Sequence, residues 1–148
     1  KVFFSEKSLE NFYYIELILN IFPNAKFINP YRNLADNVFA VYKQFLSNVS
    51  WSHSLENILV YFDNYLSTID YFKKKYSDKI LSIQLEKFTN NPEKSAKEIY
   101  NFCNLKWDTK CLDFYKREDL FTNTASINQI RNAVQKYDTK KYDANICE

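Results

Sequence analysis

Two short apolar segments separated by helical sequence constrain the fold of this chain more than any other feature. The first, A-K-F-I (25–28), ends at Asn29-Pro30, where we expect the proline to break strand pairing. The second is K-I-L-S-I-Q-L-E-K-F (79–88), about fifty residues further along the chain. Strands separated by helices favour an α/β unit in which the strands run parallel. No internal repeat or low-complexity linker intervenes, so we expect no domain boundary.

Helical periodicity fills the sequence around these two segments. Residues 8–22 place apolar side chains almost all round one helix, so we expect that helix to be buried and to end at Pro23. Three further helices are predicted from a capping residue followed by apolar residues at helical spacing: from Asn33 over 34–46, with Asp36 in its first turn; from Ser54 to the basic end 73–75; and from Asn91-Pro92 onward. Residues 121–134 indicate a polar loop with a short helical piece.

Composition excludes several classes of function. The 148 residues are 46% apolar and 18% aromatic, enough to bury the core of one domain or of part of one. The net charge of +2, from 20 basic and 18 acidic residues, does not suggest a nucleic-acid surface. The only histidine is His53, and the three cysteines lack C-x-x-C spacing. We therefore expect no nucleic acid, no metal and no paired-cysteine redox chemistry.

The cysteines and the ends of the chain bear on its location. An odd number of cysteines without a disulfide framework fits a reducing compartment, so we expect a cytoplasmic protein; a lumenal enzyme with free thiols is the alternative. No apolar run of 18 residues and no signal peptide pattern occurs, so we expect no membrane segment. The chain starts at Lys1, which suggests that it begins inside a longer reading frame.

Several motifs, in a fixed order, resemble one known family. They are E-K-S-L-E-N (6–11), F-P-N-A-K-F-I-N-P-Y-R-N-L-A-D (22–36), I-Q-L-E-K-F-T-N-N-P (83–92), F-C-N-L-K-W-D-T-K-C-L-D-F (102–114) and T-A-S-I-N-Q-I-R (124–131). Together they resemble the sulfotransferase family over about residues 4–142, most closely tyrosylprotein sulfotransferases and bacterial sulfotransferases fused to tetratricopeptide repeats.

The resemblance implies a fold and an activity. The fold is a three-layer, P-loop-kinase-like α/β fold, a parallel sheet flanked by helices, here incomplete at the N-terminus. Residues 1–148 would be the C-terminal part of a single sulfotransferase domain whose phosphate loop lies upstream. The implied enzyme transfers a sulfuryl group from 3′-phosphoadenosine 5′-phosphosulfate (PAPS) to a hydroxyl acceptor, a protein tyrosine, carbohydrate or small molecule. The 148 residues alone are then expected to be inactive.

The resemblance also implies the site residues, and sulfuryl transfer explains their chemistry. Negative charge spreads over the transferring group, so cations and hydroxyl donors are needed. Lys7 and Ser126 match residues that stabilise the transition state, and Ser126 also belongs to the cofactor loop. Arg32 matches the arginine that binds the 3′-phosphate, where its guanidinium fork suits a phosphate. The remaining expected PAPS-binding residues are Gln129, Arg131 and Lys141.

Each of these positions also has an ordinary structural interpretation. Lys7 also fits a solvated surface lysine, and Ser126 also fits a turn residue. Arg32 also fits a surface arginine or one that forms an ion pair with Asp36. A short solvated helix would account for Gln129 and Arg131. The family pattern is also broken at two places: Ala40 replaces a serine that holds the 3′-phosphate, and Leu85 replaces a tyrosine on the adenosine side. Both departures concern the side of the site that binds the nucleotide.

Other residues invite chemistry but favour simpler explanations. His53, in the polar loop 47–54 with Trp51, has the chemistry of a general base but no obvious carboxylate partner, so it stays unassigned and we expect the base upstream. The aromatic residues Tyr100, Phe102, Trp107 and Phe114 are interpreted as packing.

Two other functions remain open. A degenerate family member would have lost catalysis and would act as a binding module. A nucleotide kinase of the same broad fold would carry a G-x-x-x-x-G-K-[ST] loop upstream. The residues do not identify the acceptor or the oligomeric state.

Overall fold

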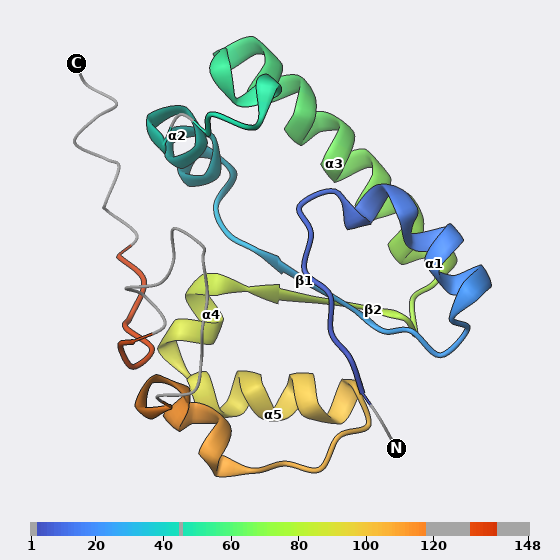
Figure 1. Cartoon of the computed structure of the whole chain (residues 1–148), viewed down its shortest axis with the longest axis vertical. Coiled ribbons are helices and arrows are strands. Elements are labelled where there is room, and N and C mark those ends of the chain that lie inside the picture. Colours follow the sequence, from blue (N-terminus) through green and yellow to red (C-terminus); the bar gives the residue numbers. More distant parts are fainter. Residues whose placement is uncertain (1–2, 45, 118–130, 139–148) are drawn as a thin grey trace. The chain divides into compact units, whose positions relative to one another are not determined.

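A computed structural model of the chain describes residues 3–44, 46–117 and 131–138 (Figure 1). Its helices and strands alternate as expected for an α/β protein. In chain order they are the 3-10 helix η1 (Asn11–Tyr14), α1 (Ile15–Ile21), β1 (Phe27–Tyr31), α2 (Leu34–Gln44), the 3-10 helix η2 (Ser50–His53), α3 (Leu55–Lys75), β2 (Ile80–Gln84), α4 (Leu85–Asn90), α5 (Pro92–Phe102) and the 3-10 helix η3 (Thr109–Lys116).

The strands β1 and β2 pair side by side in a parallel sheet, which is the sheet that the described part of the chain contains (Figure 1). The Phe27 amide donates to the Lys79 carbonyl at 2.8 Å, just before β2 begins. The Asn29 side-chain amide lies 3.4 Å from the Ser82 hydroxyl further along. The parallel α/β arrangement is therefore confirmed, whereas the third layer of a P-loop-kinase-like fold stays a prediction.

Both strand boundaries differ from the prediction. The first strand was expected to stop before Pro30, but β1 continues through it to Tyr31. In a two-stranded sheet, one edge of each strand has no partner strand. Proline lacks an N–H donor, so a strand tolerates it where that position faces the unpaired edge. The second strand was expected over 79–88 but ends at Gln84, and residues 85–88 begin α4. Leu, Glu and Lys are good helix formers, which favours this turn of helix.

The three predicted helix caps are confirmed. The side-chain oxygen of Ser54 accepts the Asn57 amide at 3.2 Å at the start of α3. Asn91 accepts the Lys94 amide at 3.2 Å, with Pro92 as the first residue of α5. The remaining cap is Asn33, which accepts the Ala35 amide at 2.9 Å at the start of α2. Local side-chain hydrogen bonds of this kind satisfy amides that a helix cannot pair internally.

The chain divides into two compact units, and both strands contribute residues to each. The first unit comprises Lys1–Phe27 and Asn33–Leu81, and the second Ile28–Arg32 and Ser82–Glu148. In the first unit, a core joins η1 and α1 to α3 and the start of β2; its buried residues are Phe12, Ile15, Tyr61, Ile69, Phe72 and Ile80. Trp51 stacks on Tyr61 with ring centres 3.7 Å apart. Burial raises the pKa of the Tyr61 hydroxyl to about 12.

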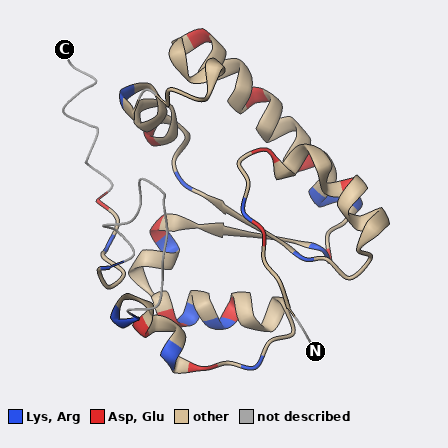
Figure 2. Ribbon diagram, in the orientation of Figure 1, with Lys and Arg blue, Asp and Glu red and all other residues tan. Residues whose placement is uncertain are grey.

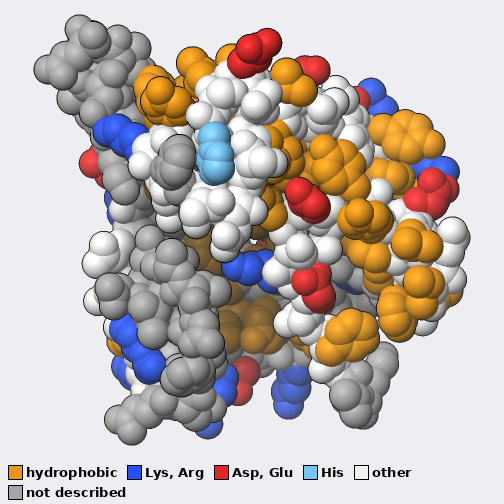
Figure 3. Space-filling view, turned by 45° about the horizontal axis from the view of Figure 1, so that its top comes forward, with side chains coloured by type: hydrophobic (Ala, Val, Ile, Leu, Met, Phe, Trp, Pro, Cys, Tyr) orange, Lys and Arg blue, Asp and Glu red, His pale blue; other side chains and the backbone are white. Residues whose placement is uncertain are grey.

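The expectation that residues 8–22 form one buried helix was wrong in two respects. The helical region begins as η1 at Asn11, and only Phe12 and Ile15 are buried in η1 and α1. Leu17 is 55% exposed and Ile21 is 60% exposed. Among the described residues, the core contacts one side of α1, so its other apolar side chains stay at the surface. Apolar side chains are prominent on the molecular surface in Figure 3.

In the second unit, α4 and α5 pack together and η3 packs against α5. The ring of Tyr100 meets Trp107 edge-on with centres 5.2 Å apart, which supports the interpretation of these aromatic residues as packing. Asn104 ends α5 in the left-handed conformation, at φ 55°, and the Leu105 amide then donates to the Tyr100 carbonyl. Glycine usually fills this position, but the sequence has none, and asparagine tolerates it.

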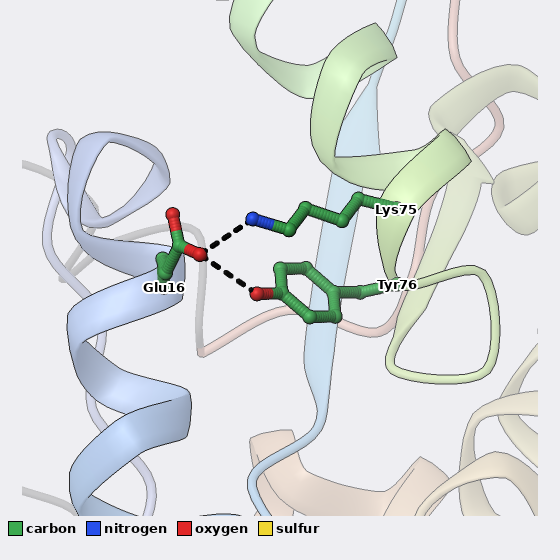
Figure 4. A network of polar contacts seen from close by, with 3 residues as sticks. All are labelled: Glu16, Lys75 and Tyr76. Carbon is green, nitrogen blue, oxygen red and sulfur yellow. Dashed lines mark hydrogen bonds and ion pairs between the residues drawn. The ribbon is translucent and has the colours of Figure 1, made fainter.

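A polar network links α1 to the end of α3 in the first unit (Figure 4). The Glu16 carboxylate accepts hydrogen bonds from the Lys75 ammonium at 2.5 Å and the Tyr76 hydroxyl at 3.0 Å. These two donors hold the pKa of Glu16 below its ordinary value of 4.5, and the carboxylate raises the pKa of Lys75. The network is exposed to solvent, so its contribution to stability is small.

The lowered pKa of Glu16 predicts a pH dependence. Glu16→Gln should lower the melting temperature slightly at pH 7, and the difference from wild type should shrink as the pH falls below 4.5. The sign follows because a carboxylate with a depressed folded-state pKa stabilises the fold above its unfolded pKa and loses this effect on protonation. Calorimetric melting at several pH values measures it. Glu98→Gln, an exposed glutamate of α5 without an ion pair among the described residues, should show no such trend.

Burial along α3 yields a second prediction. Ile58 is 0% exposed, whereas its neighbour Leu59 is 50% exposed on the same helix. Ile58→Ala should reduce the free energy of unfolding by about 2 to 5 kcal/mol, because it leaves a cavity as well as losing buried apolar surface. Leu59→Ala should change it by less than about 0.5 kcal/mol. Urea unfolding of both variants tests this, and equal effects would contradict the described orientation of α3.

Candidate active site

Arg32 lies at the carboxyl end of β1, in the connection that leads into α2. The connection is short, since β1 ends at Tyr31 and α2 begins at Leu34. Figure 2 shows a basic residue in this connection. The side chain is half-buried. Ligands of parallel α/β sheets bind outside the carboxyl ends of the strands, so Arg32 occupies a position where a phosphate could be bound.

The segment 131–138 reaches Arg32 within the second unit. The Arg32 guanidinium carbon lies 5.9 Å from the centre of the Tyr137 ring, within the range of a cation–π contact. The Tyr137 amide donates to the Thr89 hydroxyl of α4 at 3.0 Å. Thr89 in turn donates to the Glu86 carbonyl at 3.3 Å. Tyr137 therefore contacts both α4, through its amide, and Arg32, through its ring.

Arg131, a predicted PAPS-binding residue, begins the same segment. It is exposed, and its Nη1 donates to the Arg117 carbonyl at 2.7 Å, just after η3. The guanidinium thereby anchors the start of the segment to the second unit. A guanidinium has five N–H donors, so an arginine can make several hydrogen bonds at once.

Lys7 belongs to the first unit. It lies in the segment before η1, which forms neither helix nor strand, and it is exposed. The preceding residue, Glu6, accepts a hydrogen bond from Asn11, which ties this segment to η1. The following residue, Ser8, lines an open cleft. Residues 8–10 and 48–51 line this cleft, which has a volume of about 290 Å³. Lys7 thus precedes a solvent-accessible cleft directly in sequence.

His53 is held by the backbone of its own loop. Its Nε2 lies 3.1 Å from the Leu46 carbonyl, and since a carbonyl can only accept, Nε2 carries the proton there. The neighbouring Ser52 is buried, and its hydroxyl contacts the Val49 carbonyl at 2.7 Å. The ring is exposed, and the histidine is visible at the surface in Figure 3. These contacts support a structural role for the loop and leave His53 unassigned.

Three of the predicted site residues, Ser126, Gln129 and Lys141, lie outside the described residues. The two positions that depart from the family pattern are described: Ala40 is half-buried in α2, and Leu85 opens α4. Among the residues that the structure describes, no group of three His, Cys, Asp or Glu side chains could hold a metal ion. None of the described helices is long and apolar enough to cross a membrane.

Sequence reasoning missed Tyr137 and Thr89. Their hydrogen bond joins positions 48 residues apart. Thr89 lies within the motif of residues 83–92, but the motif gives no role to it, and Tyr137 lies outside the motifs. Thr89 also fell just beyond the predicted strand 79–88, because α4 was not anticipated. Only the presence of an aromatic residue in a polar segment that also contains Arg131 and Lys141 could have suggested Tyr137.

Comparison with known proteins places these features in context. The model of one family, described as the sulfotransferase family, matches residues 1–109. The matched part includes Lys7 and Arg32, whereas Ser126, Gln129, Arg131 and Lys141 lie beyond it. The chain is also 28% identical over 141 residues to an "Uncharacterized protein" of Aquifex aeolicus (strain VF5). That alignment covers 93% of this chain but 18% of the relative, so the chain spans less than a fifth of the relative's length.

Proposed function

This chain belongs to the sulfotransferase family, and we propose that its protein transfers a sulfuryl group from PAPS to a hydroxyl acceptor. The structural observation that carries the proposal is the half-buried guanidinium of Arg32, held at the carboxyl end of β1 against the Tyr137 ring. The acceptor would be a protein tyrosine, a carbohydrate or a small hydroxylated molecule.

The residues around Arg32 fit the 3′-phosphate of the donor. A guanidinium presents donors in a planar fork that matches phosphate oxygens, and the carboxyl edge of a parallel sheet is where such ligands bind. Arg131 adds a second guanidinium in the same unit. Of the other predicted donors, Gln129 and Lys141 would extend this site from the C-terminal part of the chain. Ala40 provides no hydroxyl, so Arg32 would contribute a larger share of the phosphate binding.

Lys7 is the proposed cation for the transfer itself, with Ser126 as a hydroxyl donor. When bound, PAPS supplies the sulfuryl group, and negative charge develops on its equatorial oxygens and on the bridging oxygen that leaves. An ammonium beside the reacting group would stabilise this charge. The exposed position of Lys7 next to the cleft of residues 8–10 and 48–51 supports access of both substrates, and this cleft is the proposed place of the acceptor.

The second candidate function is a non-catalytic binding module. Ala40 and Leu85 favour it, because each replaces a side chain that relatives use for the nucleotide. The two functions differ in what they predict. A sulfotransferase binds the donor nucleotide and turns over, whereas an eroded module would have lost one or both properties.

Binding of adenosine 3′,5′-bisphosphate, the product of PAPS, tests the donor site. Arg32→Ala in the full-length protein should weaken binding about ten- to a hundredfold, because a charge-assisted hydrogen-bonding pair is lost. Isothermal titration calorimetry measures the change. Lys106→Ala, which removes an exposed positive charge elsewhere in the second unit, is the matched control and should bind normally. Equal affinities of wild type and Arg32→Ala, or no binding by either, would overturn the site.

Turnover tests the role of Lys7. Lys7→Ala should lower kcat about a hundred- to a thousandfold, the cost of removing one group that stabilises transition-state charge. Affinity for adenosine 3′,5′-bisphosphate should change little, since that nucleotide lacks the reacting sulfuryl group. The assay follows transfer from radiolabelled PAPS to a panel of phenolic, carbohydrate and peptide acceptors. Lys73→Ala, at the exposed end of α3, controls for loss of a lysine; an unchanged kcat in Lys7→Ala would contradict the assignment.

A further inference from the structure

Three contacts in the second unit form a continuous connection from α4 to the predicted phosphate-binding arginine. The Glu86 carbonyl accepts from the Thr89 hydroxyl at 3.3 Å, and that hydroxyl accepts from the Tyr137 amide at 3.0 Å. The Tyr137 ring then lies 5.9 Å from the Arg32 guanidinium carbon. Thr89 therefore uses its hydroxyl both as donor and as acceptor, which only a serine could reproduce among residues of similar size.

We propose that Tyr137 and Thr89 are positioning residues that orient the Arg32 guanidinium toward the 3′-phosphate of the donor nucleotide. The inference rests on the proposed function, because it assumes that Arg32 binds this phosphate. Neither residue needs to touch the nucleotide. Tyr137 acts through the face of its ring, and Thr89 acts by fixing the backbone that carries the ring.

The physical reason lies in the freedom of an arginine side chain. Arginine carries high rotamer entropy, and ordering it when a ligand binds costs affinity. An aromatic ring against the guanidinium restrains it before the ligand arrives. Stacking uses the face of a guanidinium, whereas hydrogen bonds to phosphate oxygens use N–H groups in its plane, so the two contacts are compatible. This restraint matters more here than in a site with a serine at position 40, since Ala40 provides no hydroxyl to share the phosphate binding with Arg32.

The restraint depends on where the ring is held. Tyr137 lies in a segment without helix or strand, so no regular backbone hydrogen bonding of its own places the ring. Its amide is anchored on Thr89, three residues beyond the Glu86 carbonyl in α4. Because α4 directly follows β2, and β2 pairs with β1, the ring is tied to the same sheet edge as Arg32.

Nucleotide titrations on the full-length protein test the inference. Tyr137→Leu should weaken adenosine 3′,5′-bisphosphate about three- to tenfold, the value of a partly buried cation–π contact. Affinity for adenosine 5′-monophosphate, which lacks the 3′-phosphate, should not change. Tyr137→Phe keeps the ring and should bind like wild type. Thr89→Val should weaken bisphosphate binding as much as Tyr137→Leu does. Thr89→Ser keeps the hydroxyl and should bind the bisphosphate like wild type.

A double-mutant cycle separates positioning from general stability. If Tyr137 acts through Arg32, Tyr137→Leu has no further effect on bisphosphate affinity in an Arg32→Ala background. An additional loss in that background, or equal weakening of both nucleotides, would overturn the inference, because a purely structural defect acts in this way. If Tyr137→Leu does not fold, the same cycle with Thr89→Val decides the question, since that variant keeps the Tyr137 side chain and removes only the anchor of its backbone.

The outcomes also distinguish this inference from the proposed function. Failure of wild type to bind adenosine 3′,5′-bisphosphate would overturn the donor site itself and the positioning role with it. Loss of binding in Arg32→Ala together with normal binding in Tyr137→Leu and Thr89→Val would leave the donor site standing and overturn the positioning role alone. The inference is supported only when all three variants lose affinity and Tyr137→Phe and Thr89→Ser do not.

Discussion

The pairing of β1 with β2 is the constraint on which the candidate donor site depends. The two strands are adjacent in the sheet although α2 and α3 separate them in sequence. Parallel pairing brings the carboxyl ends of both strands to one edge, so Arg32 leaves β1 at the edge where α4 begins after β2. The pairing therefore ties Thr89, which anchors the Tyr137 amide, to the strand that carries Arg32.

The features of the fold that sequence predicted well are those decided by local chemistry. The caps at Asn33, Ser54 and Asn91 depend on hydrogen bonds within a few residues, so their sequence signals are direct. The strand ends were predicted less well, because whether Pro30 is tolerated depends on which side of the strand has a partner. Leu85 begins a helix instead of continuing the strand. A short apolar run fits a strand and a buried helix equally well, so the sequence pattern does not place this boundary.

The site residues also divide into those that local sequence predicts and those that depend on the tertiary fold. Arg32 was identified from its place after a strand and from the family motif, and its position at the sheet edge agrees with that expectation. Tyr137 could not be identified, because the contact that gives it a role depends on the tertiary fold rather than on a spacing in the sequence. The surface of α1 is a related case. Apolar residues on all sides of a helix predict burial, but Leu17 and Ile21 are exposed because burial depends on which elements are present to cover them.

The aromatic packing has a consequence for how the protein can be observed. Its two tryptophans are divided between the units: Trp51 stacks on Tyr61 in the first, and Trp107 meets Tyr100 in the second. Indole emission responds to the surroundings of the ring, so each tryptophan reports on its own unit. A pair of single-tryptophan proteins, made by replacing one indole at a time with phenylalanine, would make the unfolding of either unit visible by its own fluorescence, without any attached dye.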